Sequence, residues 1–260
     1  MTKTALITGA SGGLGLSFVK VFAKEGYDLV IVARNTQRLE SIKADTEAEF
    51  GVNVKIISKD LTNENAPHEI FLETEKENIK VDVLVNNAGF GDFGKFADSC
   101  VEKQSDMIAL NVSSLVKLTH FYLKDMIERG SGRILNVASI AAFQPGPLMS
   151  VYYATKAFVL SFSEALAVET KGTGVKITAL CPGPIKTDFE KRADLEESGL
   201  FKNLKVWSPD VIAKFGYKKM MQNKTVCIKG GLNKLITFSS RLAPRALVRN
   251  SVYQIQKPKK

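Results

Sequence analysis

Residues 4–15 read TALITGASGGLG, a short apolar run that leads directly into a turn rich in glycine. The apolar run predicts a buried β-strand, and the residues after the turn predict an amphipathic helix that ends at Gly26. The apolar face of this helix consists of Leu14, Phe18, Val21 and Phe22. A strand, a glycine turn and a helix in this order indicate the first part of a β-α-β unit.

Gly9, Gly13 and Gly15 suit a turn that binds phosphate. Glycines at this spacing allow a tight turn, close approach of backbone N–H groups to a pyrophosphate, and close packing of the helix on the sheet. Glycines are common in turns for conformational reasons alone. A glycine turn that follows a strand and opens an amphipathic helix is much more specific, and it predicts a nucleotide site.

Six further apolar runs alternate with helical patterns along the chain. Together with the first run they predict seven strands. The ranges of these strands are 4–7, 28–33, 54–58, 81–86, 132–139, 175–181 and 225–229. Most of these runs are apolar throughout, as in strands that helices cover on both faces. We therefore predict an α/β fold with a doubly wound parallel sheet, in one domain over 1–260 without an internal repeat or linker.

In such a sheet, ligands bind beyond the carboxyl ends of the strands. After the second strand comes Arg34, and the acidic residue that usually binds the ribose 2′-hydroxyl of NAD is absent there. A guanidinium can bind a 2′-phosphate in a bidentate fork, which favours NADP(H) over NAD(H). The alternative is a solvated arginine at a helix start.

Polar and small residues also follow the other strands. Asp60 and Leu61 follow the third strand, where they could contact an adenine. The turn NNAG at 86–89 lets the backbone approach a cofactor. The fifth strand ends at Ser139, and the sixth leads into Pro182-Gly183, which forces a turn.

Two adjacent tyrosines precede a lysine in SVYYATK, residues 150–156. On a helix, both Tyr152 and Tyr153 could meet Lys156 on one face. An isolated Y-x-x-x-K is usually a set of core aromatics beside a solvated lysine, so the spacing alone does not assign a role. The helical face of Tyr152 continues through Lys156 to Ser163, whereas Tyr153 shares a face with Ala157, Leu160 and Glu164.

Together these motifs resemble the short-chain dehydrogenase/reductase family, in the family's order over residues 4–187. They are TGASGGLG, NNAG, Asn111 within a long helix, Ser139, Y-x-x-x-K at 152–156 and P-G-x-x-x-T at 182–187. The resemblance implies a Rossmann fold and a catalytic set of Asn111, Ser139, Tyr152 and Lys156. The cofactor contacts that it implies are Gly9, Ser11, Gly13, Leu14, Gly15, Arg34, Asp60, Leu61, Asn87, Ala88, Gly89, Tyr152, Lys156, Pro182, Gly183, Ile185 and Thr187.

The chemistry of carbonyl reduction explains why such residues are needed. The cofactor supplies a hydride and an acid must protonate the oxygen. A tyrosine with a pKa of about 10 is a slow acid–base catalyst near neutral pH. The positive charge of Lys156 can lower that pKa. Ser139 can orient the carbonyl. In the family, the asparagine matching Asn111 helps hold a water that relays protons to the lysine. The register favours Tyr152 as the acid and Tyr153 as a packing residue.

The surroundings of this set predict a hydrophobic carbonyl compound as substrate. The loop 140–149, IAAFQPGPLM, is apolar, and Phe90, Phe93 and Phe189 follow the fourth and sixth strands. Residues 188–223 are interpreted as a substrate lid and a helix capped by Ser208-Pro209-Asp210. The alternative function is a non-catalytic NADP(H)-binding sensor with the same fold.

Composition limits the remaining possibilities. The chain has 260 residues, 45% hydrophobic and 24% charged, which is typical of a soluble globular protein. It contains neither an apolar run of about 18 residues nor a signal peptide, so we expect a cytoplasmic protein. Three scattered cysteines and two histidines predict no metal site.

The net charge of +9 belongs to the C-terminal segment. From Lys224 onward there are nine Lys or Arg residues and no Asp or Glu, so the remainder is neutral and predicts no nucleic-acid partner. Residues 231–260 form a basic arm, in which Pro244 would separate two short helices. We favour packing of this arm on the protein or on a partner subunit over binding to anionic lipid.

Apolar side chains around 100–129 and 152–170 predict a homodimer or a homotetramer. They lie on more than one helical face and include Leu115, Leu118, Phe121, Phe158, Phe162 and Leu166. In the family these helices form a two-fold interface.

Overall fold

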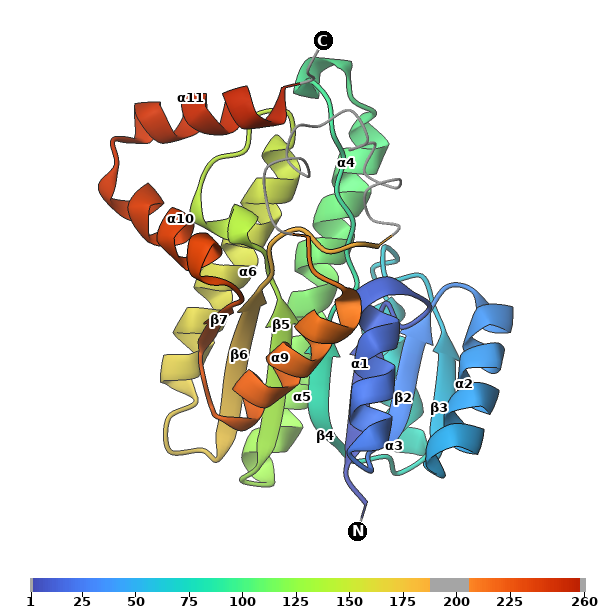
Figure 1. Cartoon of the computed structure of the whole chain (residues 1–260). Helices are drawn as coiled ribbons and strands as arrows, with labels where there is room; N and C mark the ends of the chain where they lie inside the picture. The colour runs from blue at the N-terminus through green and yellow to red at the C-terminus, as the bar shows by residue number, and fades with distance from the viewer. Residues whose placement is uncertain (1, 188–205, 258–260) are drawn as a thin grey trace.

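The structure, a computed structural model, describes residues 2–187 and 206–257. Among them, seven strands form one sheet in the order β3-β2-β1-β4-β5-β6-β7, and all neighbours are parallel (Figure 1). The strands are β1 (Thr4–Thr8), β2 (Asp28–Ala33), β3 (Val54–Ser58), β4 (Val81–Asn86), β5 (Gly132–Val137), β6 (Val175–Cys181) and β7 (Val226–Ile228). The predicted doubly wound sheet is confirmed, and its order reverses between β1 and β4, where such folds bind ligands.

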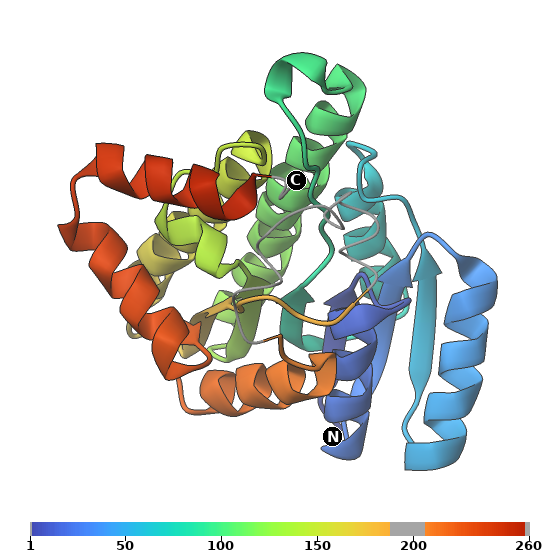
Figure 2. The same cartoon turned by 45° about the horizontal axis from the view of Figure 1, so that its top comes forward.

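Helices cover both faces of the sheet (Figures 1 and 2). They are α1 (Gly13–Lys24), α2 (Thr36–Phe50), α3 (Ala66–Lys76), α4 (Val101–Ile108), α5 (Leu115–Glu128), α6 (Ser150–Glu169), α9 (Pro209–Met221), α10 (Gly231–Leu242) and α11 (Arg245–Gln256). Shorter turns of helix are η1 (Phe96–Asp98), η2 (Ala109–Ser114) and η3 (Ile140–Phe143).

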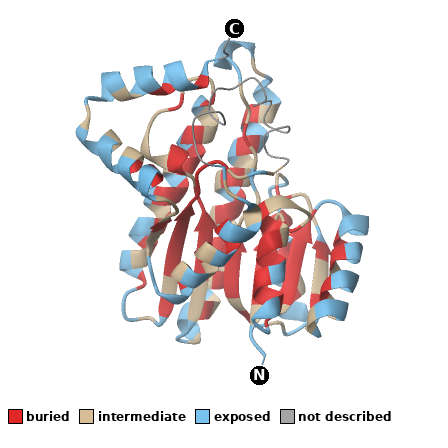
Figure 3. Ribbon diagram, viewed as in Figure 1, coloured by how far each residue is buried: buried red, intermediate tan, exposed pale blue. Residues whose placement is uncertain are grey.

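Alternate residues of each strand face opposite layers of the core. Ile7 of β1 packs in the cluster formed with α1, α2 and α9, whereas Leu6 packs in the cluster formed with α3, α5 and α6. Both side chains are fully buried. The continuous apolar character of the strands therefore arises because each face has its own layer of helices, as the red strands in Figure 3 show.

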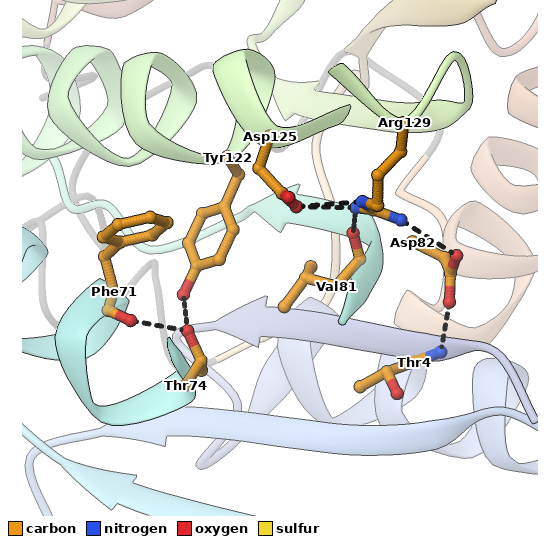
Figure 4. A network of polar contacts seen from close by, with 8 residues as sticks. All are labelled: Thr4, Phe71, Thr74, Val81, Asp82, Tyr122, Asp125 and Arg129. Carbon is orange, nitrogen blue, oxygen red and sulfur yellow. Dashed lines mark hydrogen bonds and ion pairs between the residues drawn. The ribbon is translucent and has the colours of Figure 1, made fainter. Parts of the chain in front are cut away.

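Polar contacts connect elements at the amino-terminal end of the sheet (Figure 4). The guanidinium of Arg129 donates to the Asp125 carboxylate at 2.8 and 3.1 Å and to the Val81 carbonyl at 2.8 Å. It also lies 3.6 Å from Asp82, which in turn accepts from the Thr4 N–H at 2.9 Å. These contacts join the end of α5 to the starts of β1 and β4.

A second contact in the same view joins two helices. The buried hydroxyl of Tyr122 on α5 lies 2.9 Å from the hydroxyl of Thr74 on α3, which donates to the Phe71 carbonyl at 2.8 Å. Burial raises the pKa of Tyr122, so the phenol stays neutral. Both networks lie away from the carboxyl edge of the strands, which is left open for a ligand.

Three details differ from the sequence prediction. The strand β5 ends at Val137 because Ser139 instead caps η3, with its hydroxyl accepting from the Ala141 N–H. The edge strand β7 is shorter than predicted and pairs only with β6. The long helix predicted around Asn111 contains the π-helical turn η2 between α4 and α5, a feature that often marks functional sites.

The predicted helix ends in the C-terminal third are confirmed. Ser208 caps α9 with its side chain, which accepts from the Val211 N–H at 3.4 Å, and Pro209 is the first helical residue. Pro244 separates α10 from α11. Most of the predicted lid, residues 188–205, and Phe189 within it lie outside the described residues. No described helix is both long and apolar enough to cross a membrane.

The predicted dimer surface is smaller than expected from the sequence. Leu115, Leu118 and Leu166 are buried in the core of the subunit itself. Phe158 remains 42% exposed and stacks on the half-buried Phe162, with ring centroids 5.8 Å apart.

Candidate active site

A cleft of about 850 Å³ lies at the carboxyl edge of the sheet. The glycine turn after β1, the start of α2 and the segments after β3, β4, β5 and β6 surround it, together with residues of α6, α10 and α11. With the exception of Asn111, every predicted site residue lines this cleft. The topology thus brings together residues that are up to 178 positions apart in the sequence (Gly9 to Thr187).

The glycine turn has no room for a side chain at Gly9 or Gly15. Gly9 and Gly13 adopt positive φ angles of 68° and 52°, which glycine tolerates readily. A Cβ at Gly15 would lie 2.0 Å from the Gly9 carbonyl oxygen. A Cβ at Gly12, by contrast, would meet open space. The turn therefore brings bare backbone and the N-terminus of α1 to the cleft, which fits a dinucleotide pyrophosphate.

Thr8 joins this turn to the segment after β4, and sequence reasoning missed it. Its hydroxyl accepts from the N–H groups of Asn87 and Ala88 at 3.0 Å each. The Asn87 amide in turn donates to the Thr8 carbonyl at 2.9 Å. A threonine at a strand end gives no signal of its own, because the contact depends on the pairing of β1 with β4.

Cationic side chains gather where β2 and β3 end. Arg34 lies 3.7 Å from Asp60, but the two side chains are 72% and 41% exposed, so this ion pair is weak. Burial alone would raise the pKa of Asp60, but hydrogen bonds from Thr62 and the charge of Arg34 lower it overall. Lys59 also lines the cleft, and Arg38 donates to the Ser11 carbonyl at 3.4 Å. Neither was predicted from the sequence.

Ser139 and Tyr152 meet at the end of β5. Their hydroxyl groups are hydrogen-bonded to each other. Burial raises the pKa of Tyr152 to about 12, and the bond with Ser139 offsets this only in part. Burial of the phenol therefore outweighs any lowering of this pKa by Lys156 in the protein as described.

Lys156 is buried beside Tyr152. Its Nζ atom donates to the Val137 carbonyl at 2.9 Å and lies 5.8 Å from the centre of the Tyr152 ring. Burial lowers the pKa of Lys156 to about 8, because a buried ammonium loses its hydration. A Cβ at Gly89 would lie 2.8 Å from the Oδ1 atom of Asn111, so the glycine leaves room for that amide beside the lysine.

The Asn111 side chain connects the segment after β4 with α6. Its amide accepts from the Phe90 N–H at 3.1 Å and donates to the Phe90 carbonyl at 2.9 Å. It also contacts the Thr155 hydroxyl on α6 at 3.1 Å. The π-turn η2 carries the residue, so the irregular helix holds the segment after β4 against the helix of the tyrosines.

Tyr153 packs, as the sequence predicts. Its ring lies against Gly146, where a Cβ would approach it to 2.2 Å, and it belongs to a cluster with Ala141, Met149 and Val252. Its hydroxyl accepts from the Gln256 amide of α11. The two adjacent tyrosines thus have different partners, Ser139 for Tyr152 and Gln256 for Tyr153.

The segment after β6 closes the cleft from the other side. The Pro182 carbonyl accepts from the Ile140 N–H at 2.9 Å, and a Cβ at Gly183 would lie 2.6 Å from the Asn233 amide. A Cβ at Gly13 would lie 3.2 Å from the methyl group of Thr187. The segment 182–187, which the sequence analysis assigned to the cofactor site, therefore lies against the glycine turn through Thr187.

The apolar wall of the cleft includes residues that the sequence prediction missed. Phe90 lines the cleft as expected, and Phe93 packs behind it with Met149 and Tyr153. The additional lining residues come from the C-terminal helices and are Ile236, Val252 and Ile255. Among residues 2–187 and 206–257, no cluster of three or more His, Cys, Asp or Glu side chains could hold a metal ion.

Comparison with known proteins agrees with this geometry. Residues 3–198 match the short chain dehydrogenase family. The chain is 37% identical over 193 residues to mouse 17-beta-hydroxysteroid dehydrogenase type 3, which covers 74% of this chain and 63% of the relative. It is 32% identical over 194 residues to the bovine very-long-chain 3-oxoacyl-CoA reductase, which covers 72% and 61%. The chain thus spans less than two thirds of the length of these two relatives.

A solved structure extends the similarity beyond the family match. A short-chain dehydrogenase from Sphingobium yanoikuyae in complex with NADPH superposes with a TM-score of 0.83 at 30% identity, over 92% of this chain and 94% of the other. The seven-stranded sheet, the glycine turn and the family match agree. This chain belongs to the short-chain dehydrogenase family of oxidoreductases, whose fold binds a nicotinamide cofactor.

Proposed function

We propose that this protein reduces a hydrophobic ketone or aldehyde to the alcohol with NADPH, or catalyses the reverse reaction with NADP⁺. The observation that carries the proposal is the meeting of Ser139, Tyr152 and Lys156 beside the glycine turn, at one edge of the sheet. A protein that only bound the nucleotide would not need this set.

The chain's own residues would bind and protonate the carbonyl. The hydroxyl groups of Ser139 and Tyr152 already contact each other, so a carbonyl oxygen placed between them receives two hydrogen bonds. With a pKa of about 12, Tyr152 is protonated at neutral pH and serves as the acid for the developing alkoxide. When bound, the cofactor supplies the hydride. The buried Lys156 stabilises the phenolate that remains.

The lining of the cleft supports a hydrophobic substrate. Phe90, Ile140 and Met149 form one part of it, and the apolar side chains of α10 and α11 form another. Such a lining suits a ligand with one carbonyl on a large apolar frame. The names of the mouse and bovine relatives, with steroid and long acyl substrates, are consistent with this class.

Three cations support the preference for NADP(H). Arg34 and Lys59 line the cleft where a ribose 2′-phosphate would lie, and Arg38 is bonded to the glycine turn. A phosphate with a charge near −2 gains charge-assisted hydrogen bonds there, whereas a ribose hydroxyl does not. The NADPH complex of the Sphingobium yanoikuyae enzyme is a further support. We also propose that the protein acts in the cytoplasm, as a dimer or tetramer.

The test measures the loss of NADPH absorbance with a panel of bulky ketones, diketones and aldehydes, and repeats it with NADH. We expect turnover with NADPH and a lower kcat/KM with NADH. Arg34→Ala should raise the Kd for NADPH by about tenfold or more and barely change that for NADH, because it removes a charge-assisted contact. Lys76→Ala, which removes an exposed cation of α3, is the control.

Two results would contradict the proposal. Tight NADPH binding without turnover of any carbonyl compound would favour a nucleotide sensor. Equal losses for NADPH and NADH in Arg34→Ala would reject the assignment of this arginine to the 2′-phosphate.

A further inference from the structure

The outward face of α10 is apolar, and its inward face is polar. Asn233 and Thr237 are 6% and 3% exposed and face the protein. Ser240 is half-buried and donates to the Phe143 carbonyl at 3.3 Å. This is the reverse of a helix that covers a core, where the apolar stripe faces inward.

The outward stripe consists of large side chains. They are Leu232, Leu235, Phe238 and Leu242, which are 55%, 63%, 61% and 73% exposed. The spacing places them within about a third of the helix circumference. Leu247 of α11 adds a further side chain that is 62% exposed, and Figure 3 shows both helices mostly in the pale blue of exposed residues. A continuous apolar stripe of this kind marks an interaction site.

Basic residues accompany the stripe. Lys234 and Arg241 of α10 and Arg245 and Arg249 of α11 are exposed. No acidic residue lies between 224 and 260, and none of these four side chains forms an ion pair among the described residues. The surface thus combines exposed apolar side chains with uncompensated positive charge.

We propose that α10 and α11 dock the protein on an anionic lipid surface. An apolar stripe flanked by Lys and Arg is the pattern of helices that lie in the membrane interface, where leucines enter the acyl region and cations meet lipid phosphates. A two-fold contact between copies would instead place these arginines against one another. Charge complementarity therefore favours anionic lipid over a second copy of the chain.

The arm keeps its contacts with the protein in this arrangement. Val252 and Gln256 of α11 are buried, and Ile236 and Ile255 line the cleft, so the docking stripe is a different part of the same two helices. The sequence analysis favoured an arm that packs on the protein with its arginines in solvent. These four residues do pack on the protein, and the arginines of the arm are exposed. The sequence analysis did not anticipate that most of the arm's leucines would face outward.

The test uses the full chain and sedimentation with vesicles. Vesicles of phosphatidylcholine and phosphatidylglycerol in equal parts are compared with vesicles of phosphatidylcholine alone, at low and high salt. We expect binding to the anionic vesicles that weakens as salt increases. Leu235→Ser/Phe238→Ser and Arg245→Gln/Arg249→Gln should each weaken that binding by about tenfold or more.

Matched controls make the result specific to the arm. Leu72→Ser removes a leucine of α3 that is 52% exposed, and Lys20→Gln/Lys24→Gln removes two exposed cations of α1. Both should bind vesicles like the wild type. Circular dichroism and thermal unfolding establish that every variant is folded, and light scattering follows the oligomeric state.

Three outcomes would overturn the proposal. The first is a wild-type protein that does not sediment with anionic vesicles at low salt. The second is equal weakening in the arm variants and in their controls, which would indicate a general charge effect. The third is dissociation of an oligomer by Leu235→Ser/Phe238→Ser without lipid binding by the wild type, which would assign the stripe to a second copy.

Discussion

At the scale of single residues, the roles of Tyr152 and Tyr153 follow from what their hydroxyl groups contact. Tyr152 bonds to Ser139 in the cleft, while Tyr153 bonds to Gln256 of the C-terminal helix. The Y-x-x-x-K spacing could not separate them, because both tyrosines lie within one turn of Lys156. Only the family register and the face shared with Ser163 favoured Tyr152.

Substituting each tyrosine in turn tests this distinction. Tyr152→Phe should lower kcat by about two to four orders of magnitude, the usual contribution of a positioned proton donor, with the Kd for NADPH unchanged. Tyr153→Phe should leave kcat nearly unchanged, since the ring still fills its site. The measurement is steady-state reduction of one ketone by both variants. An inactive Tyr153→Phe beside an active Tyr152→Phe would shift the register by one residue.

Burial of Lys156 predicts a pH-dependent stability. Its pKa of about 8 in the folded protein lies below the ordinary 10.5, so between these values the unfolded chain binds more protons and stability rises with pH. Relative to Lys156→Met, the wild type should gain roughly 2 to 3 kcal/mol in the free energy of unfolding from pH 7 to pH 10. Urea unfolding at both pH values measures it, with Lys20→Met as control. A difference that does not change with pH would contradict the burial of this lysine.

At the scale of elements, the strands and the helix ends were predictable, but the packing of the C-terminal arm on the cleft was not. Each strand is a local apolar run, and glycine, proline and serine signals mark the ends of α1, α9 and α10 in the sequence itself. The π-turn at Asn111 interrupts a continuous helical pattern, so no local signal reveals it. The contribution of α11 to the cleft depends on a contact between residues 103 positions apart, Tyr153 and Gln256. Such long-range packing leaves no trace in local periodicity.

The contact between Gln256 and Tyr153 should hold α11 on the cleft. Gln256→Ala leaves the buried Tyr153 hydroxyl without its partner and opens a cavity, at a cost of about 1 to 3 kcal/mol in unfolding free energy. A loosened apolar wall should raise KM for a hydrophobic ketone more than it lowers kcat. Gln254→Ala, at an exposed position of the same helix, is the control. Unchanged stability and KM in Gln256→Ala would mean that the contact does not position the helix.

At the scale of the whole molecule, the exposed Phe158, which stacks on the half-buried Phe162, is the main part of the predicted dimer surface that stays at the surface of the subunit. Phe158→Arg would place like charges across a two-fold interface and should convert an oligomer to a monomer at micromolar concentration. Light scattering measures the mass, with Leu72→Arg on α3 as control. A wild type that is already monomeric would reject the interface.

The central claim is that the cleft transfers a hydride from NADPH to a carbonyl carbon. The most direct measurement uses NADPH with deuterium in place of both hydrogens at C4 of the nicotinamide, followed by mass spectrometry and NMR of the product. The account predicts an alcohol with one deuterium on the former carbonyl carbon, formed by the wild type and nearly absent with Tyr152→Phe. Saturable NADPH binding without a labelled alcohol from any hydrophobic ketone or aldehyde would contradict it.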